Sequence, residues 1–142
     1  METRMFRTIL TTMIFAASTT VVFGAAHEMA PAVEAADQDV SGGTVSAMSI
    51  MAPANGWLVV HRTDAEMAPG PVVGYAPLKM GENSDVTAIL QEEVAPGDML
   101  MLMVHGEDGG MSTGVFEYTL GATEDGPIRV DGDLVMTVVT AE

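Results

Sequence analysis

The chain has 142 residues, no cysteine, and 20 acidic against 5 basic side chains, for a net charge of −15. The length allows one domain, the lack of cysteine excludes disulfides and cysteine nucleophiles, and the acidic surface excludes nucleic acid and anionic lipid as partners. Such a surface suits a saline medium, where salt screens the repulsion between like charges.

The N-terminus has the pattern of an export signal. Two arginines precede an apolar run at residues 9–26 that ends in small residues, which is typical of a secretory signal peptide. Cleavage after Ala26 would leave His27 at the N-terminus, and cleavage after Ala32 also satisfies the small-residue rule. The alternative is an uncleaved anchor, because the run approaches the roughly 20 residues that span a bilayer. We predict a signal peptide at residues 1–26 and a soluble mature protein, without stable membrane insertion, that is periplasmic or extracellular.

The remaining chain has the pattern of an all-β domain. Residues 27–39 are rich in alanine, proline and acid without periodicity, which predicts a flexible leader. From residue 40 onward, short apolar segments alternate with turns of Gly, Pro, Asn and Asp. The predicted strands lie at residues 44–51, 57–61, 72–78, 85–91, 99–105, 115–120, 128–130 and 134–141. Seven or eight such strands predict an antiparallel two-sheet sandwich at residues 40–142, immunoglobulin-like or cupredoxin-like.

Two positions carry more specific expectations about the backbone. Gly74 interrupts a predicted strand, where a bulge or a close approach of another backbone is expected. Asp131 and Gly132 form a type I′ hairpin signal between the last two predicted strands.

The predicted strand at residues 99–105, MLMLMVH, raises the main functional question. Because side chains alternate along a strand, Met103 and His105 share one face with Met99 and Met101, and the other face is also apolar. Two apolar faces indicate a central strand that is covered on both sides. Thioethers bind copper(I) and imidazole binds copper in either state, but methionine also fills irregular cores. Only Met103 and His105 are close enough within this strand to share one ion.

His61 resembles His105 in its place, since each ends a predicted strand ahead of an acidic loop. If the two strands are neighbours in one sheet, the imidazoles could lie close together and form a copper site with Met103. The alternative is that each histidine is hydrogen-bonded to a loop carbonyl or carboxylate. His27, if cleavage made it N-terminal, would chelate copper(II) through its amine and imidazole.

The other candidate sites have simpler interpretations. None of the acidic loops matches a twelve-residue calcium loop, so acidic pairs such as Glu124/Asp125 are predicted to be solvated turn residues. Trp57 is predicted to anchor the core. There is no glycine-flanked serine elbow and no phosphate-binding loop. We therefore predict a non-enzymatic structural or interaction module with an unknown protein partner and no cofactor. The alternative is a periplasmic protein that binds copper, a soft metal ion, through His61, Met103 and His105.

Five motifs, taken together in this order, resemble a known family. They are Gly56-Trp57 with His61, Pro69-Gly70-Pro71, Met103-Val104-His105 with Asp108, Phe116-Glu117-Tyr118 and Asp125-Gly126-Pro127. This order resembles an uncharacterised family of secreted domains of unknown function that is found in haloarchaea and bacteria. The resemblance implies export, a β-sandwich and tolerance of salt, and it implies no activity. Because the pattern includes both His61 and His105, it favours a shared role for them, structural or metal-binding.

Overall fold

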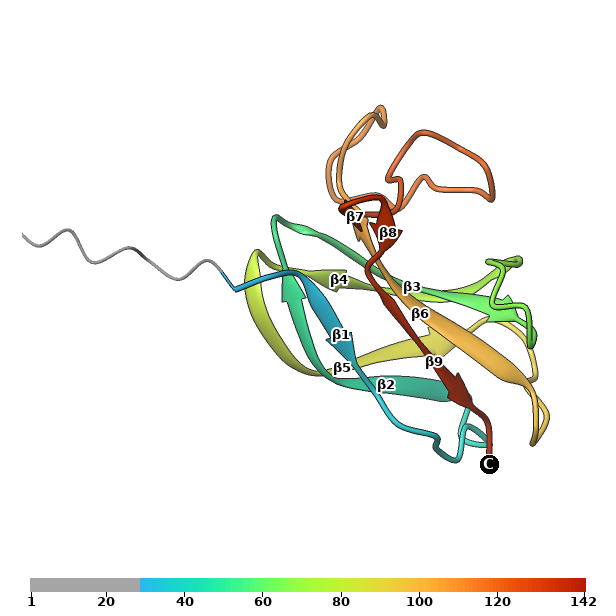
Figure 1. Cartoon of the computed structure of the whole chain (residues 1–142). Coiled ribbons are helices and arrows are strands. Elements are labelled where there is room, and N and C mark those ends of the chain that lie inside the picture. Colours follow the sequence, from blue (N-terminus) through green and yellow to red (C-terminus); the bar gives the residue numbers. More distant parts are fainter. Residues whose placement is uncertain (1–28) are drawn as a thin grey trace, which may run out of the picture.

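The computed structural model describes residues 29–142, so the predicted signal peptide and His27 lie outside the described part. Within that part the chain is all β, as the sequence predicted (Figure 1). Its strands are β1 (Ala32–Glu34), β2 (Thr44–Ala52), β3 (Gly56–Thr63), β4 (Val72–Leu78), β5 (Gly81–Leu90), β6 (Met99–Gly106), β7 (Arg129–Val130), β8 (Asp133–Leu134) and β9 (Met136–Thr140). Between residues 29 and 142, no helix is long and apolar enough to cross a membrane.

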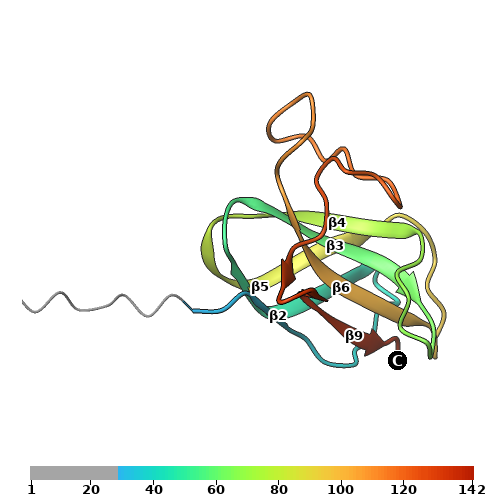
Figure 2. The same cartoon turned by 45° about the horizontal axis from the view of Figure 1, so that its top comes forward.

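Seven of these strands form one antiparallel sheet in the order β1-β2-β5-β4-β3-β6-β9, while β7 and β8 form a separate hairpin. The large sheet curls until its two ends nearly meet, with β1, β2 and β5 on one side and β3, β6 and β9 on the other (Figures 1 and 2). Gln38, just after β1, donates its N–H to Thr140 O at 3.3 Å and accepts from the N–H of Glu142 at 2.9 Å. The curled sheet is consistent with the predicted sandwich, because its two halves face each other across one core.

The core lies inside the curl and follows the alternation of side chains. Leu58 and Val60 of β3 point into it, as do Leu100, Leu102 and Val104 of β6, and all five are at most 1% exposed. Burial of apolar surface against β2 and β5 drives the closure. As expected for a central strand, β6 lies between β3 and β9 and is buried on both faces.

Two segments differ from the sequence prediction. The sheet begins at β1, inside the segment that was predicted as a flexible leader up to residue 39. The segment is too short to show a period, and its pairing partner, β2, lies further along the chain. Residues 115–120, predicted as a strand, form none and belong instead to a long excursion between β6 and β7. Both neighbouring positions beside β6 are already taken by β3 and β9, so this excursion has no strand edge to join there.

The two backbone expectations are confirmed. A Cβ on Gly74 would lie 2.7 Å from Ile89 O, so the glycine permits a close approach of β4 and β5. Asp131 and Gly132 have φ values of 53° and 94°, and a type I′ turn requires positive φ at both positions.

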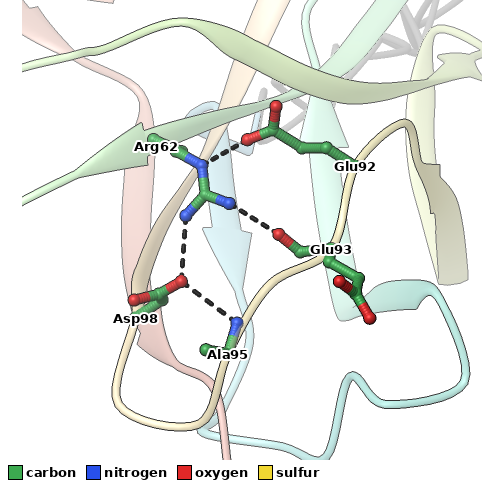
Figure 3. A network of polar contacts seen from close by, with 5 residues as sticks. All are labelled: Arg62, Glu92, Glu93, Ala95 and Asp98. Carbon is green, nitrogen blue, oxygen red and sulfur yellow. Dashed lines mark hydrogen bonds and ion pairs between the residues drawn. The ribbon is translucent and has the colours of Figure 1, made fainter.

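Arg62, near the end of β3, is hydrogen-bonded to three residues of the loop between β5 and β6 (Figure 3). Its guanidinium donates to the carboxylate of Glu92, to Asp98 Oδ2 at 3.0 Å and to Glu93 O at 2.7 Å. The hydrogen bond from Arg62 lowers the pKa of Asp98, with help from a backbone N–H. A planar guanidinium suits three acceptors in different directions, and the network fixes the end of the strand that carries His61.

Candidate metal centre

The outer face of β3 and β6 is buried as completely as the core face, although it lies outside the main core cluster. Its six residues are Trp57, Val59 and His61 of β3 and Met101, Met103 and His105 of β6, each at most 6% exposed. Part of the cover over this face is the excursion at residues 107–127, which we term the cap loop. It rises above the sheet between β6 and β7 (Figures 1 and 2).

Aromatic side chains of the cap loop seal the outer face. Phe116 packs edge-on against Trp57 with ring centroids 5.5 Å apart. Tyr118 packs edge-on against both imidazoles, at 4.5 Å from His105 and 5.8 Å from His61. This sealing explains why two histidines outside the core are fully shielded from water.

The sheet register brings the two predicted histidines together. Val59 pairs with Met103, and His61 and His105 lie diagonally on either side of that pair. The rings lean toward each other, so that their Nε2 atoms are 3.4 Å apart. Met103, the third predicted ligand, is 1% exposed and occupies the same face between them.

Backbone carbonyls fix the orientation of both rings. His61 Nδ1 donates to Gly70 O at 2.8 Å, and His105 Nδ1 donates to Asp125 O at 2.7 Å. A carbonyl oxygen only accepts, so each ring carries a proton on Nδ1. The three contacts of the pair, including Nε2 to Nε2, need three N–H groups, whereas two neutral imidazoles have two. Two lone pairs therefore face each other unless a third proton or a metal ion lies between them.

Burial keeps the third proton away at neutral pH. It lowers the pKa of His61, which the hydrogen bond to Gly70 only partly opposes. Burial, together with a smaller effect of the neighbouring His61, lowers the pKa of His105 to about 4, although the hydrogen bond to Asp125 O and the Asp125 carboxylate act in the opposite direction. Both rings are consequently neutral at pH 7, and neutral imidazole is the form that binds metals.

The loop after β3 places the carbonyl that holds His61. Gly70 donates its N–H to Arg62 O at 2.8 Å, and a Cβ on Gly70 would lie 2.7 Å from that same oxygen. Only glycine allows this approach. The pairing of β3 with β4 also shifts register between Val60 and His61, which is a local irregularity at the site.

Asp125 places the carbonyl that holds His105, and the sequence prediction for this residue was wrong. It is 0% exposed rather than a solvated turn residue. It has φ 45°, a left-handed conformation that Asp tolerates better than most residues. Its N–H donates to Asp108 O and its Oδ2 accepts from the N–H of Glu117, both at 2.8 Å. The Asp125-Gly126-Pro127 motif signalled a tight turn here but gave no indication of burial.

The remaining donors near the pair are few. In the described part of the chain no third His, Cys, Asp or Glu joins the histidines to form a metal cluster. Trp57 Nε1 and Asp125 Oδ1 are buried side-chain atoms without a hydrogen-bond partner. His27 lies outside the described residues. The structure thus unites His61 and His105 from two strands, with Met103 as the neighbouring soft donor.

A family model described as a domain of unknown function (DUF7282) matches residues 31–142. The chain belongs to this family. Its DUF7282 domain extends from the residue before β1 to the C-terminus, so it contains the whole curled sheet, the cap loop and both histidines. No curated protein and no solved structure matches the chain.

The lowered pKa of His105 predicts a loss of stability of the DUF7282 domain in acid. Below its usual value of 6.5 the unfolded chain takes up a proton that the folded chain refuses, so the stabilisation is present above about pH 6.5 and is lost toward about pH 4. The loss is on the order of 3 kcal/mol in the free energy of unfolding. Urea unfolding at several pH values measures it.

His105→Asn is the matched variant for this measurement, because it keeps a side-chain N–H near the Nδ1 position and does not titrate. Its stability should fall less steeply over the same pH range. Parallel pH profiles for the two proteins, or a normal pKa for His105 in a proton NMR titration, would contradict the assignment.

Proposed function

We propose that this chain is an exported, non-enzymatic β-sandwich module that binds one copper(I) ion between His61 and His105. The observation that supports this best is the pair of buried Nε2 atoms, which face each other at 3.4 Å with no proton to share. The family match supplies no activity, so the proposal rests on this site.

The distance between the two nitrogens favours a site with more than two ligands. With metal–nitrogen bonds of about 2.0 Å, two nitrogens 3.4 Å apart form an angle of roughly 115° at the ion. A linear two-coordinate ion would hold them further apart. The third donor we propose is the thioether of Met103, which lies between the histidines on the same face. Thioether sulfur selects soft copper(I), whereas zinc prefers additional thiolate, imidazole or carboxylate ligands.

The hydrogen bonds of the two rings also support metal binding. Metal-ligating histidines usually donate the other ring N–H to a carbonyl or carboxylate, which fixes the tautomer and the ring orientation. His61 and His105 both do so, through Gly70 O and Asp125 O. A pair that is already oriented loses little entropy when it binds an ion.

The cap loop would control access to the ion. Tyr118 contacts both rings and is itself only partly buried, so its displacement would expose the rings to solvent. A closed apolar cover excludes water, and it would protect copper(I) from oxidation in an exported protein.

An interaction role is the alternative function, and a separate observation favours it. The cap loop exposes three apolar side chains, Met111 at 95%, Val115 at 53% and Leu120 at 56%, in a chain of net charge −15. Exposed apolar groups on an acidic surface are suited to a protein partner. If the protein binds no ion, the histidine pair is a structural contact and this role remains.

Titration of the full chain with copper(I), or with silver(I) as a redox-inert substitute, tests the proposal. We expect one ion per chain and micromolar or tighter affinity. His61→Asn and His105→Asn keep an N–H near Nδ1 and lose Nε2. Each should weaken binding by more than the roughly 10–100-fold that loss of an outer-shell contact costs. His27→Ala is the control for binding by the third histidine of the chain and should bind like the parent. An absence of binding, or unchanged affinity in both asparagine variants, would overturn the proposal.

The methionines of β6 offer a matched test of the third ligand. Met103 and Met101 are both buried on the same face of one strand. Met103→Leu preserves volume and removes the sulfur, so copper(I) affinity should fall by about 10-fold or more. Met101→Leu should change it by less than about threefold, because the register places Met101 directly opposite His61 rather than between the two histidines. Equal effects of the two substitutions would exclude Met103 as the ligand.

The position of β1 bears on where the proposed signal peptide is cleaved. Cleavage after Ala32 would remove the first residue of β1, whereas cleavage after Ala26 leaves the strand whole. We therefore propose cleavage after Ala26, in a saline periplasmic or extracellular medium, as the acidic surface and the resemblance to domains of haloarchaea and bacteria imply. The mass of the exported protein tests this, and an N-terminus at Val33 would contradict it.

A further inference from the structure

Asp125 is the only acidic side chain that is fully buried among residues 29–142. Its Oδ2 accepts one hydrogen bond, from the N–H of Glu117, and its Oδ1 has no partner. In the same part of the chain both ion pairs belong to Arg62, so no arginine or lysine balances Asp125. A buried carboxylate without a counter-charge is costly, and its presence needs a reason.

The carboxylate is electrostatically coupled to the histidine pair. Its own backbone carbonyl binds His105 Nδ1 at 2.7 Å, which places the two residues in direct contact. The negative charge of Asp125 also acts on the His105 ring, where it favours positive charge. In a site shielded from water such a charge acts with little screening.

The summed charge of the cluster indicates which kind of ion would suit it. Two neutral imidazoles and a thioether carry no charge, so an ionised Asp125 gives the buried cluster a charge of −1. A monovalent cation makes the cluster neutral, whereas a divalent cation leaves an unbalanced positive charge inside the protein. We infer that Asp125 is the buried counter-charge for a soft monovalent cation, copper(I) or silver(I), held between His61 and His105. It is a positioning residue rather than a ligand, and this inference rests on the proposed function.

Asp125→Asn isolates the charge. Asparagine also tolerates the left-handed backbone, its side-chain oxygen still accepts from Glu117, and the backbone carbonyl that orients His105 remains. Asp108→Asn is the matched control, because Asp108 lies in the same cap loop but is exposed. Silver(I) is the probe, added to the full chain and to each variant.

We expect Asp125→Asn to weaken silver(I) binding without lowering the stability of the ion-free protein. Asp125→Asn should weaken silver(I) binding by about 10-fold or more, since an opposite charge at a buried site contributes at least as much as an outer-shell contact. Without the ion, the same variant should be at least as stable to urea as the parent, because it removes an unpaired buried charge. Asp108→Asn should change neither quantity appreciably.

The outcomes separate the inference from the proposed function. If the parent protein does not bind silver(I), the proposed function fails. If the parent binds and Asp125→Asn binds equally well, only the counter-charge fails. If the ion-free variant is destabilised in proportion to its loss of binding, Asp125 has a structural role and the inference is again overturned. Ring proton NMR shifts of His61 and His105 on silver binding should be the same in the variant, because the ligands do not change.

Discussion

Two hydrogen bonds determine the state of the site, because they decide which nitrogen of each ring carries its proton. His61 Nδ1 donates to Gly70 O and His105 Nδ1 donates to Asp125 O. With both protons committed to carbonyls, the lone pairs of both Nε2 atoms point into the space between the rings. Removal of either carbonyl would let one ring change tautomer and form an ordinary N–H···N bond. The cation affinity that we propose for the pair would thus depend on backbone positions in two separate loops.

The segments that carry the family resemblance are the same segments that build this arrangement. The glycine of Gly56-Trp57 allows β3 to approach the backbone of His105, where a side chain would collide. Pro69-Gly70-Pro71 supplies the carbonyl for His61, and Asp125-Gly126-Pro127 supplies the one for His105. Phe116-Glu117-Tyr118 supplies the two covering rings and the N–H that holds the Asp125 carboxylate. In this chain, the motifs that carry the resemblance are therefore the ones that surround the histidine pair.

The local sequence pattern was sufficient to predict the main strands and the shared face of Met103 and His105. It was insufficient to predict the path of the cap loop and the burial of Asp125. Alternation and turn residues located the main strands, and they placed Met103 and His105 on one face because that relation depends only on neighbouring residues. The segment at residues 115–120 alternates in the same way yet forms no strand, because a strand needs a free edge and β6 has none to offer. Asp125 looked like a solvated turn for a similar reason. Its burial comes from the folding of the cap loop over β3 and β6, which no local pattern contains.

The polar groups buried at the outer face indicate that apolar packing alone does not explain its composition. Together with the cap loop over it, this face encloses two imidazoles with opposed lone pairs, an unpartnered carboxylate oxygen of Asp125 and the unpartnered indole N–H of Trp57. Each of these costs stability relative to an apolar side chain of similar size. The core face of the same two strands avoids these costs, because only leucine and valine side chains fill it. Departures from consistent packing of this kind are expected where a protein binds something. A cation between the rings would remove two of these costs together, because it would occupy both lone pairs and balance the carboxylate.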